Sequence, residues 1–349
     1  MKKLTRLFFC VVSLASLGAQ SPDAVRATNP GELFASENLH AWCVVPFDAK
    51  KRGPQERAAM LAKLGFKRFV YDWREKDIPT FDAEIEAMKM RGIEITAWWS
   101  PTDPRDPVLR TMLEVFKRQK VHPQLWVMGS GAPVKTPGEQ RLRVEQEAAR
   151  IRDIALLAKP YGCTVELYNH NGWFGVPDNE VAVIERLREL GVADVGMVYN
   201  FSHGHADIAD FAAIWKRMQP HVVAVNVTGM VKDGESKIMP PSQGDFELGM
   251  LRVVLNGGWR GPIGLIAEQG GDAEVTLGNY LRGLEWCGKE LVKPGSGGPR
   301  PNFAPPARAA KQDGKLVPGR FGKALDSSGG GILLAGDDAW RAAPITVEA

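Results

Sequence analysis

Cysteine is scarce in this sequence, which has four among 349 residues. Cys10 lies within an apolar stretch at the start of the chain, and the remaining three, Cys43, Cys163 and Cys287, show no paired spacing. An odd number of cysteines without a repeated spacing is not the pattern of a disulfide-stapled protein. We therefore expect no disulfide framework, and free, buried thiols.

The sequence also lacks a block of basic residues, a glycine-rich phosphate loop and an apolar stretch long enough to span a membrane, and each absence argues against a class of protein. No block of basic residues stands out, which argues against a nucleic-acid-binding protein because such proteins must neutralise phosphates. No glycine-rich phosphate loop follows the first predicted strand, where residues 44–48 read VVPFD, which argues against an open doubly wound sheet. The apolar stretch Leu7–Leu17 is too short to span a bilayer as a helix.

The N-terminus has the pattern of a secretory signal peptide over residues 1–19. Three basic residues within the first six positions precede Leu7–Leu17, and the small residues Gly18 and Ala19 follow. Removing this leader subtracts three positive charges from the formal net charge of +3, which leaves a mature chain of about zero net charge. We therefore expect a secreted or periplasmic protein with no integral membrane segment after leader removal.

Strand and helix patterns alternate eight times between residues 36 and 292. The predicted strands are short and mostly apolar: Leu39–Val45, Arg68–Trp73, Ile93–Trp99, Gln124–Met128, Thr164–Asn169, Val195–Phe201, Val222–Val227 and Ile263–Glu268. The stretches between them are amphipathic at helical spacing, and glycines 65, 92, 162 and 191 mark helix ends. Eight such units in about 250 residues predict an α/β fold, a closed (β/α)8 barrel.

The composition changes after the barrel. Residues 293–314 are rich in proline and glycine and indicate a linker. Residues 315–349 contain the stretch Gly319–Asp326, with its GKAL sequence, and the strand-like runs Ile332–Leu334 and Pro344–Glu348. This end resembles the opening of a laminin-G or concanavalin-like β-sandwich, but too few residues are present to bury a sandwich core. Either a longer protein continues here, or this partial β segment packs on another surface.

Polar residues collect where the predicted strands end, which is where a parallel barrel builds its active site. Glu166 and Glu268 belong to the fifth and eighth strands. Two carboxylates facing each other across a pocket can bind a divalent metal and transfer protons at a carbon next to a carbonyl. The alternative is that each glutamate pairs with a buried arginine or lysine. We favour the functional interpretation and expect both to be catalytic.

Amides and histidines extend this cluster. Asn200 and Asn226 lie in the sixth and seventh strands, and amide oxygens bind hard cations or sugar hydroxyls, although asparagine is also common in turns. His170 and His203 follow the fifth and sixth strands, and His205 lies two residues beyond. We expect His170 and His203 to contact substrate, and His205 to bond a loop carbonyl.

Tryptophan is concentrated in or just after the predicted strands. Trp73, Trp99 and Trp173 stand closest to the predicted mouth of the barrel. Because the apolar face of a sugar ring packs on an indole, we predict that these three contact a small carbohydrate, with core packing as the alternative. Two charged residues have weaker claims: Asp72 at the end of the second strand, and Lys237 in the long loop 229–244.

This arrangement resembles the xylose isomerase-like superfamily of sugar isomerases and epimerases, over roughly residues 36–292. The resemblance implies a divalent metal (Mn, Mg, Co or Zn) held at the ends of strands five to eight by Glu, Asp, His and Glu. The matching positions here hold Glu166, Asn200, Asn226 and Glu268. It also implies that Asn169 and His203 contact substrate. This chain departs from the pattern at Asn200 and Asn226, which removes a negative charge and an imidazole and should lower metal affinity.

Three hypotheses of function follow. The first is an exported sugar isomerase or epimerase that transfers a proton next to a carbonyl through the glutamate pair, with a keto-glycoside lyase or hydrolase on the same site as its runner-up. The second is a sugar-binding barrel without catalysis. The third, an endonuclease-like barrel, is disfavoured by six scattered histidines and a near-neutral mature chain.

Overall fold

The fold is a closed barrel of eight parallel strands, paired in chain order from β1 to β8 and back to β1. It is seen in a computed structural model that describes residues 27–232, 238–268, 270–303, 315–319 and 322–326. The strands are β1 (Leu39–Trp42), β2 (Arg68–Tyr71), β3 (Glu94–Trp99), β4 (Gln124–Met128), β5 (Val165–Tyr168), β6 (Val195–Asn200), β7 (Val222–Val227) and β8 (Ile263–Ile266). The predicted (β/α)8 barrel is confirmed, and its closure rules out an open doubly wound sheet.

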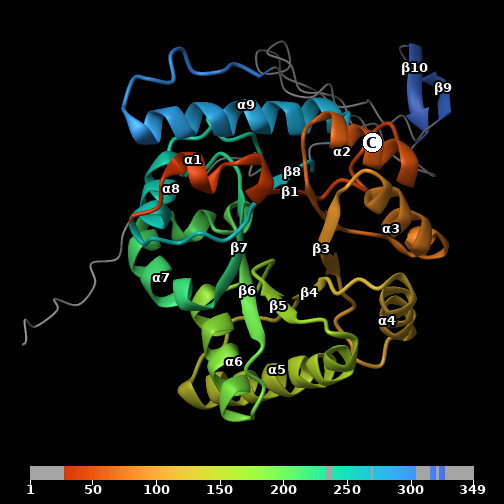
Figure 1. The fold of residues 1–349 in the computed structure, drawn as a ribbon, viewed down its shortest axis with the longest axis vertical. Helices are drawn as coiled ribbons and strands as arrows, with labels where there is room; N and C mark the ends of the chain where they lie inside the picture. Colours follow the sequence, from red (N-terminus) through yellow and green to blue (C-terminus); the bar gives the residue numbers. More distant parts are fainter. Residues whose placement is uncertain (1–26, 233–237, 269, 304–314, 320–321, 327–349) are drawn as a thin grey trace, which may run out of the picture.

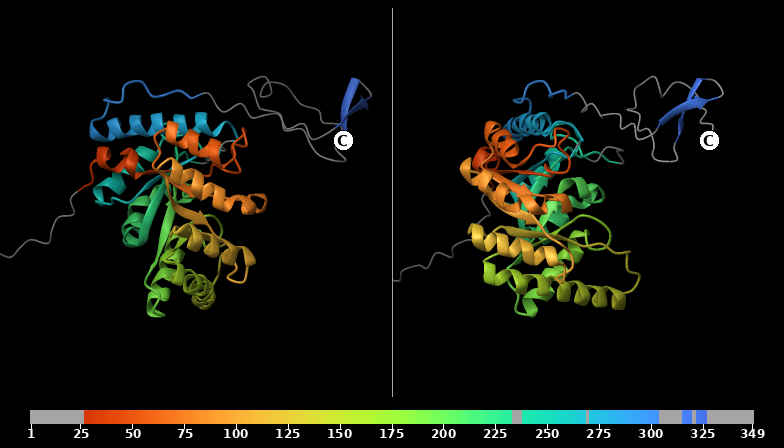
Figure 2. Two further views of the ribbon diagram at one scale, coloured as in Figure 1. Left: turned by 45° about the vertical axis from the view of Figure 1, so that its right-hand side comes forward. Right: turned by 90° about the vertical axis from the view of Figure 1, so that its right-hand side faces the viewer.

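The helices surround the barrel, as Figures 1 and 2 show from three directions. They are α1 (Pro30–Leu33), α2 (Pro54–Lys63), α3 (Phe81–Met90), α4 (Pro107–Gln119), α5 (Pro137–Ala158), α6 (Pro177–Glu189), α7 (Phe211–Met218), α8 (Glu247–Asn256) and α9 (Ala273–Val292). Local signals start them: a capping box of Thr136 and Glu139 opens α5, and the Asp272 side chain accepts the Glu274 N–H at the start of α9. The predicted glycines end α2, α3 and α6 and follow α5, each with positive φ.

Several strands end earlier than the sequence predicts, and this places the polar residues on loops. The first strand stops at Trp42 because Cys43 adopts a left-handed backbone conformation with φ of 53°. The last stops at Ile266, two residues before Glu268. Short 3-10 turns follow other elements: η1 (Ser36–Asn38), η2 (Glu75–Thr80), η3 (Lys159–Tyr161), η4 (Phe201–His203), η5 (His205–Asp210) and η6 (Gln219–His221).

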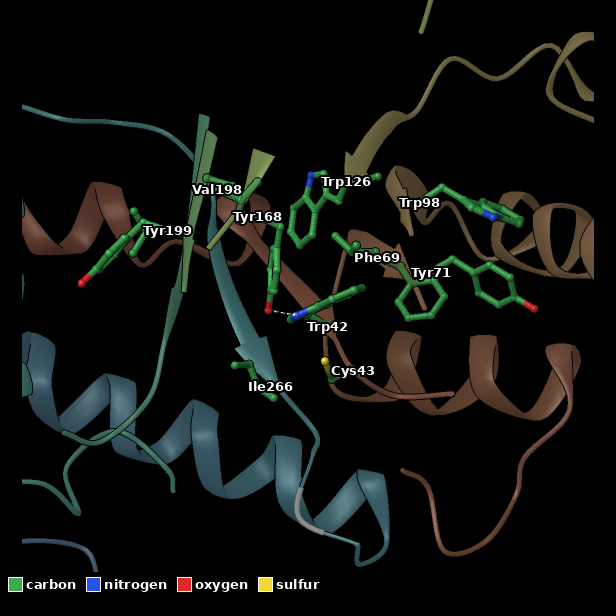
Figure 3. Packing of buried hydrophobic residues seen from close by; sticks show 14 of the residues in the cluster. Trp42, Cys43, Phe69, Tyr71, Trp98, Trp126, Tyr168, Val198, Tyr199 and Ile266 are labelled. Carbon is green, nitrogen blue, oxygen red and sulfur yellow. Dashed lines mark hydrogen bonds between the residues drawn. The ribbon is translucent and has the colours of Figure 1, made fainter. Parts of the chain in front are cut away.

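Aromatic side chains fill the end of the barrel interior toward which the strands run. Trp42, Trp126 and Tyr168 are at most 2% exposed and pack against one another (Figure 3). The Trp126 ring stacks on Tyr168 at 5.8 Å between centroids, and the Trp42 Nε1–H donates to the Tyr168 hydroxyl at 3.0 Å. These contacts stabilise the barrel in two ways, because they bury a large apolar area and satisfy two buried polar groups.

The segment after α9 contacts the barrel as far as residue 303, within the range predicted as a linker. Arg300 donates to the Gly244 carbonyl at 2.9 Å, and its guanidinium lies 5.6 Å from the Trp286 ring centroid. Farther on, β9 (Lys315–Gly319) and β10 (Gly322–Asp326) form an antiparallel pair. The predicted signal peptide, most of the predicted sandwich segment with its two strand-like runs, and Lys237 lie outside the described residues. Within those residues no helix is both long and apolar enough to span a membrane.

Candidate functional site

A pocket of about 540 Å³ opens where the strands end, at the face predicted for the active site. It receives residues from the ends of β1 to β5 and from the loops after β6 and β8. The lining residues are Trp42, Cys43, Phe47, Asp72, Trp73, Arg74, Glu75, Trp99, Ser100, Pro101, Thr102, Asp106, Met128, Tyr168, His170, His203 and Glu268. A lining that combines aromatic side chains with converging polar groups is typical of a small-molecule site.

Asp72 is the more deeply buried of the two carboxyl groups in this pocket that have a raised pKa. It is 2% exposed, and its Oδ1 accepts the backbone N–H of Val44 at 3.3 Å and of Val45 at 3.1 Å. Its Oδ2 has no hydrogen-bond partner among the described residues. Burial raises the pKa of Asp72 to about 7, although the Val45 amide and the nearby Arg74 act in the opposite direction. Asp72 can therefore hold or release a proton near neutral pH.

Glu268 is the second such carboxyl group. It is half-buried just beyond β8, and burial raises its pKa, opposed by a hydrogen bond from the Cys43 thiol and by the positive charge of Arg74. Cys43 interacts with both Glu268 and Asp72, and all three residues line the pocket. Two carboxyl groups with raised pKa values in a shared pocket can divide the work of acid and base.

Arg74 brings a positive charge to this pair without forming an ion pair with either carboxylate. Its Nη1 donates to the backbone carbonyls of Asp72 at 2.9 Å and Trp73 at 2.8 Å, and its guanidinium lies 5.8 Å from the Phe47 ring centroid. These contacts fix its position at the rim of the pocket. Its remaining N–H groups can donate to oxygen atoms of a bound molecule.

His170 and His203, the two histidines predicted to contact substrate, both line the pocket. The rings of His170 and His203 lie 4.5 Å apart, and both approach Tyr168. Burial lowers the pKa of His170, so this imidazole is neutral at pH 7 and can either donate or accept a hydrogen bond. His205, by contrast, places its Nδ1 3.1 Å from the Ser202 carbonyl oxygen, in agreement with its predicted structural role.

The three predicted tryptophans separate into two groups. Trp73 and Trp99 line the pocket, joined by a hydrogen bond of 2.7 Å from the Trp73 Nε1–H to the Trp99 carbonyl. Trp173 is not among the described lining residues: it is 3% exposed and donates to Gln140 of α5 at 2.7 Å. Core packing, the alternative interpretation for these tryptophans, applies to Trp173.

Glu166, the other predicted catalytic glutamate, does not line the pocket among the described residues. It is the second residue of β5, on the same strand face as Tyr168 but two residues earlier, or about 6–7 Å farther from the mouth. Its carboxylate accepts the Thr164 hydroxyl and the Gly196 N–H, both at 2.8 Å, and burial raises its pKa to about 7. A side chain at position 196 would meet this carboxylate, so glycine makes room for it.

The asparagines serve the barrel rather than the pocket. Asn169 exchanges two hydrogen bonds with the backbone of Asn200, at 2.7 and 3.3 Å. The Asn200 side chain accepts the Ser202 N–H at 3.1 Å and donates to the Tyr168 hydroxyl at 2.6 Å. Asn226 Oδ1 lies 3.0 Å from Nε2 of His40, whose pKa burial lowers to about 4. All three amide oxygens therefore contact neighbours within the barrel, whereas Nδ2 of Asn226 has no hydrogen-bond partner among the described residues.

These contacts do not fit the divalent metal that the family resemblance implies. Glu166, Asn200 and Asn226 already use their oxygen atoms in hydrogen bonds to neighbouring residues, and only Glu268 of the four predicted ligands lines the pocket. Across the described ranges, no three His, Cys, Asp or Glu side chains group in a way that could hold a metal ion. We therefore derive no chemical step through a metal.

Sequence reasoning gave too little weight to four residues of this pocket. Asp72 was noted only as a strand-end carboxylate, and Cys43, Arg74 and Tyr168 were not predicted as site residues. A usable signal existed for Asp72, because it precedes Trp73 at the same barrel face as Glu268. The sequence holds no such signal for Cys43, because its role depends on a left-handed backbone conformation that no sequence pattern predicts here.

Comparisons with known proteins bear on the fold. No family model and no curated protein matches the sequence. Among solved structures, the chain is similar to 3-keto-D-glucoside 4-epimerase from E. coli, with 15% identity, a TM-score of 0.54, and coverage of 72% of this chain and 98% of that one. It is also similar to a probable 3-DHS dehydratase from Bacillus anthracis, with 13% identity, a TM-score of 0.57, and 70% and 98% coverage.

A third similar structure is a xylose isomerase domain protein from Planctomyces limnophilus, with 10% identity, a TM-score of 0.52, and coverage of 73% of this chain and 98% of that one. In each case the similarity spans nearly the whole of the other chain. The described barrel of this protein therefore shares the TIM-barrel fold of these three proteins.

Proposed function

We propose that this protein is a carbohydrate-acting enzyme that transfers a proton at a carbon next to a carbonyl group. The observation that carries the proposal is the pair Asp72 and Glu268: two carboxyl groups with raised pKa values in one pocket, which both interact with Cys43 and share the pocket with indole side chains. Such pairs perform acid and base steps at neutral pH. Asp72 takes the place beside Glu268 that the sequence led us to assign to Glu166.

The chemistry assigns one role to each carboxyl group. Glu268, as the carboxylate, removes the proton from the carbon next to the carbonyl, and the electron pair moves onto the carbonyl oxygen. Asp72, as the acid, donates its proton from Oδ2 to that oxygen, since Oδ1 already accepts two amides. Protonation of the same carbon on its opposite face, with return of the enol proton to Asp72, gives an epimer. Protonation of the former carbonyl carbon, with transfer of the proton of the neighbouring hydroxyl group to Asp72, gives an isomer. Departure of an oxygen substituent from the next carbon, with the proton that Glu268 took up, gives an elimination product.

The remaining pocket residues suit a sugar. Trp73 and Trp99 offer indole surfaces to the apolar face of a ring, and His170 and His203 offer nitrogen atoms to hydroxyl groups. One protein of the same fold is a 3-keto-D-glucoside 4-epimerase, which makes a keto-sugar the first substrate class to try. The leader-like residues 1–19 lead us to propose an exported protein, and hence a free keto-sugar or keto-glycoside rather than a phosphosugar.

Hydrogen exchange tests the proposal directly. The protein is incubated with 3-keto-glucosides and simple ketoses in D₂O, and loss of the proton signal next to the carbonyl is followed by NMR. We expect exchange by the wild type, and a loss of at least about 100-fold in Glu268→Gln, as is usual when a general base is removed. Asp72→Asn should slow exchange as well. Exchange by Glu268→Gln at the wild-type rate would refute the proposal.

Glu166→Gln is the matched comparison, because it makes the same chemical change in the glutamate that the sequence predicted. Gln keeps an oxygen to accept the Gly196 N–H, and the Thr164 hydroxyl can turn to accept from its amide. We expect this variant to retain exchange. If instead Glu166→Gln were inactive and Glu268→Gln active, the chemistry would belong to the deeper glutamate.

A sugar-binding barrel without catalysis is the second candidate, favoured by the commitment of Asn200 and Asn226 to structural hydrogen bonds. It predicts saturable binding of a sugar, lost in Trp99→Ala, with no deuterium exchange for any carbonyl sugar tried. Calorimetry on the same samples separates the two candidates, because exchange accompanies binding only in an enzyme.

A further inference from the structure

Cys43 has a backbone conformation that ordinary side chains avoid. Its φ of 53° lies in the left-handed region, where a residue with a Cβ atom costs about 1–2 kcal/mol and glycine costs nothing comparable. The residue is buried, and it lines the pocket together with Asp72 and Glu268, with both of which it interacts. Strain of this kind at a pocket calls for a local reason.

The turn at Cys43 connects the two carboxyl groups. Just before it, the ends of β1 and β8 are held together by the Ala267 N–H, which donates to the Trp42 carbonyl at 2.9 Å. Just after it, the N–H groups of Val44 and Val45 both point at Asp72 Oδ1. Cys43 and Glu268 line the same pocket, and an interaction of the Cys43 thiol with the Glu268 carboxylate lowers the pKa of Glu268 against the effect of burial. Figure 3 shows the Cys43 sulfur near Ile266, the last residue of β8.

The chemistry of this thiol is that of a donor rather than a nucleophile. Burial and two neighbouring carboxyl groups raise the pKa of Cys43 well above its ordinary value, so the sulfur keeps its proton. A protonated thiol is a weak hydrogen-bond donor. The unpartnered Oδ2 of Asp72, buried in the same pocket, is left for a bound molecule.

We propose that Cys43 is a positioning residue for the acid–base pair: its turn aims two amides at Asp72, and its S–H group holds the Glu268 carboxylate toward the same bound molecule. The proposal rests on the function proposed above for this pocket. Glycine at position 43 would keep the turn without strain but would supply no donor. The thiol is therefore what cysteine supplies at this strained position and glycine would not.

Three substitutions separate the turn from the thiol. Cys43→Gly keeps the turn and removes the donor, Cys43→Ala removes the donor and keeps the strain, and Cys43→Ser restores a donor. We expect kcat for the exchange reaction to fall at least about tenfold in the Gly and Ala variants, as when a hydrogen bond to a charged group is lost, with little change in KM. The Ser variant should recover most of the loss, and Cys43→Gly should unfold at a temperature no lower than Cys43→Ala.

Cys163→Ser is the matched control, because Cys163 is also buried, and it lies outside the described lining of the pocket. It should leave kcat unchanged. A Cys43→Gly variant with wild-type kcat, or a Cys43→Ser variant as slow as Cys43→Ala, would overturn the proposal. If the wild type exchanges no substrate, the proposed function is wrong. The contact between the Cys43 thiol and Glu268 is then tested by infrared spectroscopy.

Infrared spectroscopy tests the thiol contact without turnover. The S–H stretching band that disappears in Cys43→Ala belongs to Cys43, and a hydrogen-bonded S–H absorbs at lower frequency than a free one. We expect this band to move to higher frequency in Glu268→Ala and to stay in place in Glu166→Gln. A band that does not respond to Glu268→Ala would show that the thiol does not hold Glu268, and would overturn the proposal whatever the activity.

Discussion

Replacing Asp72 by Asn should change how the stability of the protein depends on pH. Burial raises the pKa of Asp72 to about 7 in the folded state, whereas an aspartate in the unfolded chain titrates near its ordinary value. The folded state therefore binds more protons between these two values. The stabilisation linked to Asp72 is fully present below the unfolded pKa and is lost as pH rises through the folded one. Asparagine does not titrate, so the variant lacks this loss.

The size of the effect follows from the two pKa values. The rise from about 3.9 to about 7 corresponds to about 4 kcal/mol, at about 1.4 kcal/mol per pKa unit. Asparagine can still accept the Val44 and Val45 amides through its oxygen, but it places an unpartnered amide nitrogen where Oδ2 lies. That adds a cost that does not vary with pH. The difference in unfolding free energy, Asp72→Asn minus wild type, should therefore increase by about 4 kcal/mol from about pH 4 to about pH 8.

Urea unfolding of both proteins across this pH range measures the difference, and contributions of other groups cancel in the subtraction. Asp82→Asn is a control of opposite sign, because hydrogen bonds from Arg118 lower the pKa of Asp82, so its contribution is present at neutral pH and lost on acidification. If the difference in unfolding free energy between Asp72→Asn and the wild type does not change with pH, or changes in the same direction as for the Asp82 control, the claim that burial raises the pKa of Asp72 is refuted.

Two further pairs of substitutions test the packing of the barrel and its ion pairs. Gly264→Ala should destabilise the barrel by about 1–3 kcal/mol, because its Cβ would collide with Oδ1 of Asn226; Gly278→Ala in α9, where nothing lies within 4 Å, should raise the thermal midpoint instead. Arg52→Gln should cost about 3 kcal/mol in chemical denaturation, because it leaves the buried carboxylate of Asp48 without its cation. Arg105→Gln, which breaks an exposed ion pair, should leave the midpoint unchanged.

The barrel could be predicted from the sequence because its signals are local and repeated eight times. Apolar runs, helix-terminating glycines such as Gly65 and Gly191, and a capping box at Thr136 each specify structure over a few residues. The face that carries the pocket followed from topology, since all strands of a parallel barrel end on one side. Glu268, His170, His203 and two of the three predicted tryptophans therefore line the pocket.

The depth of a residue within the barrel could not be predicted in the same way. Glu166 and Glu268 both occur in apolar runs, but one lies second in its strand and the other two residues past the end of its strand. Each residue along a strand moves the side-chain position by roughly 3.2–3.4 Å. A difference of a few residues therefore decides whether a side chain lies in the pocket or in the interior below it. The strand ends themselves depend on tertiary features such as the left-handed Cys43.

The difference in depth between Glu166 and Glu268 gives a physical reason why asparagine replaces the residue that the family pattern implies. Asn200 donates to the Tyr168 hydroxyl, whereas a carboxylate at this position would have to accept from that hydroxyl and would bring a negative charge into the buried interior of the barrel. Tyr168 in turn packs with Trp42 and Trp126 between Glu166 and the mouth. An amide at position 200 thus secures the aromatic layer that separates Glu166 from bound molecules, and acid–base work falls to the carboxyl groups above that layer. On this reasoning, Asn200→Asp should not restore a metal site but should loosen Tyr168, which the near-ultraviolet circular dichroism of the aromatic cluster would report.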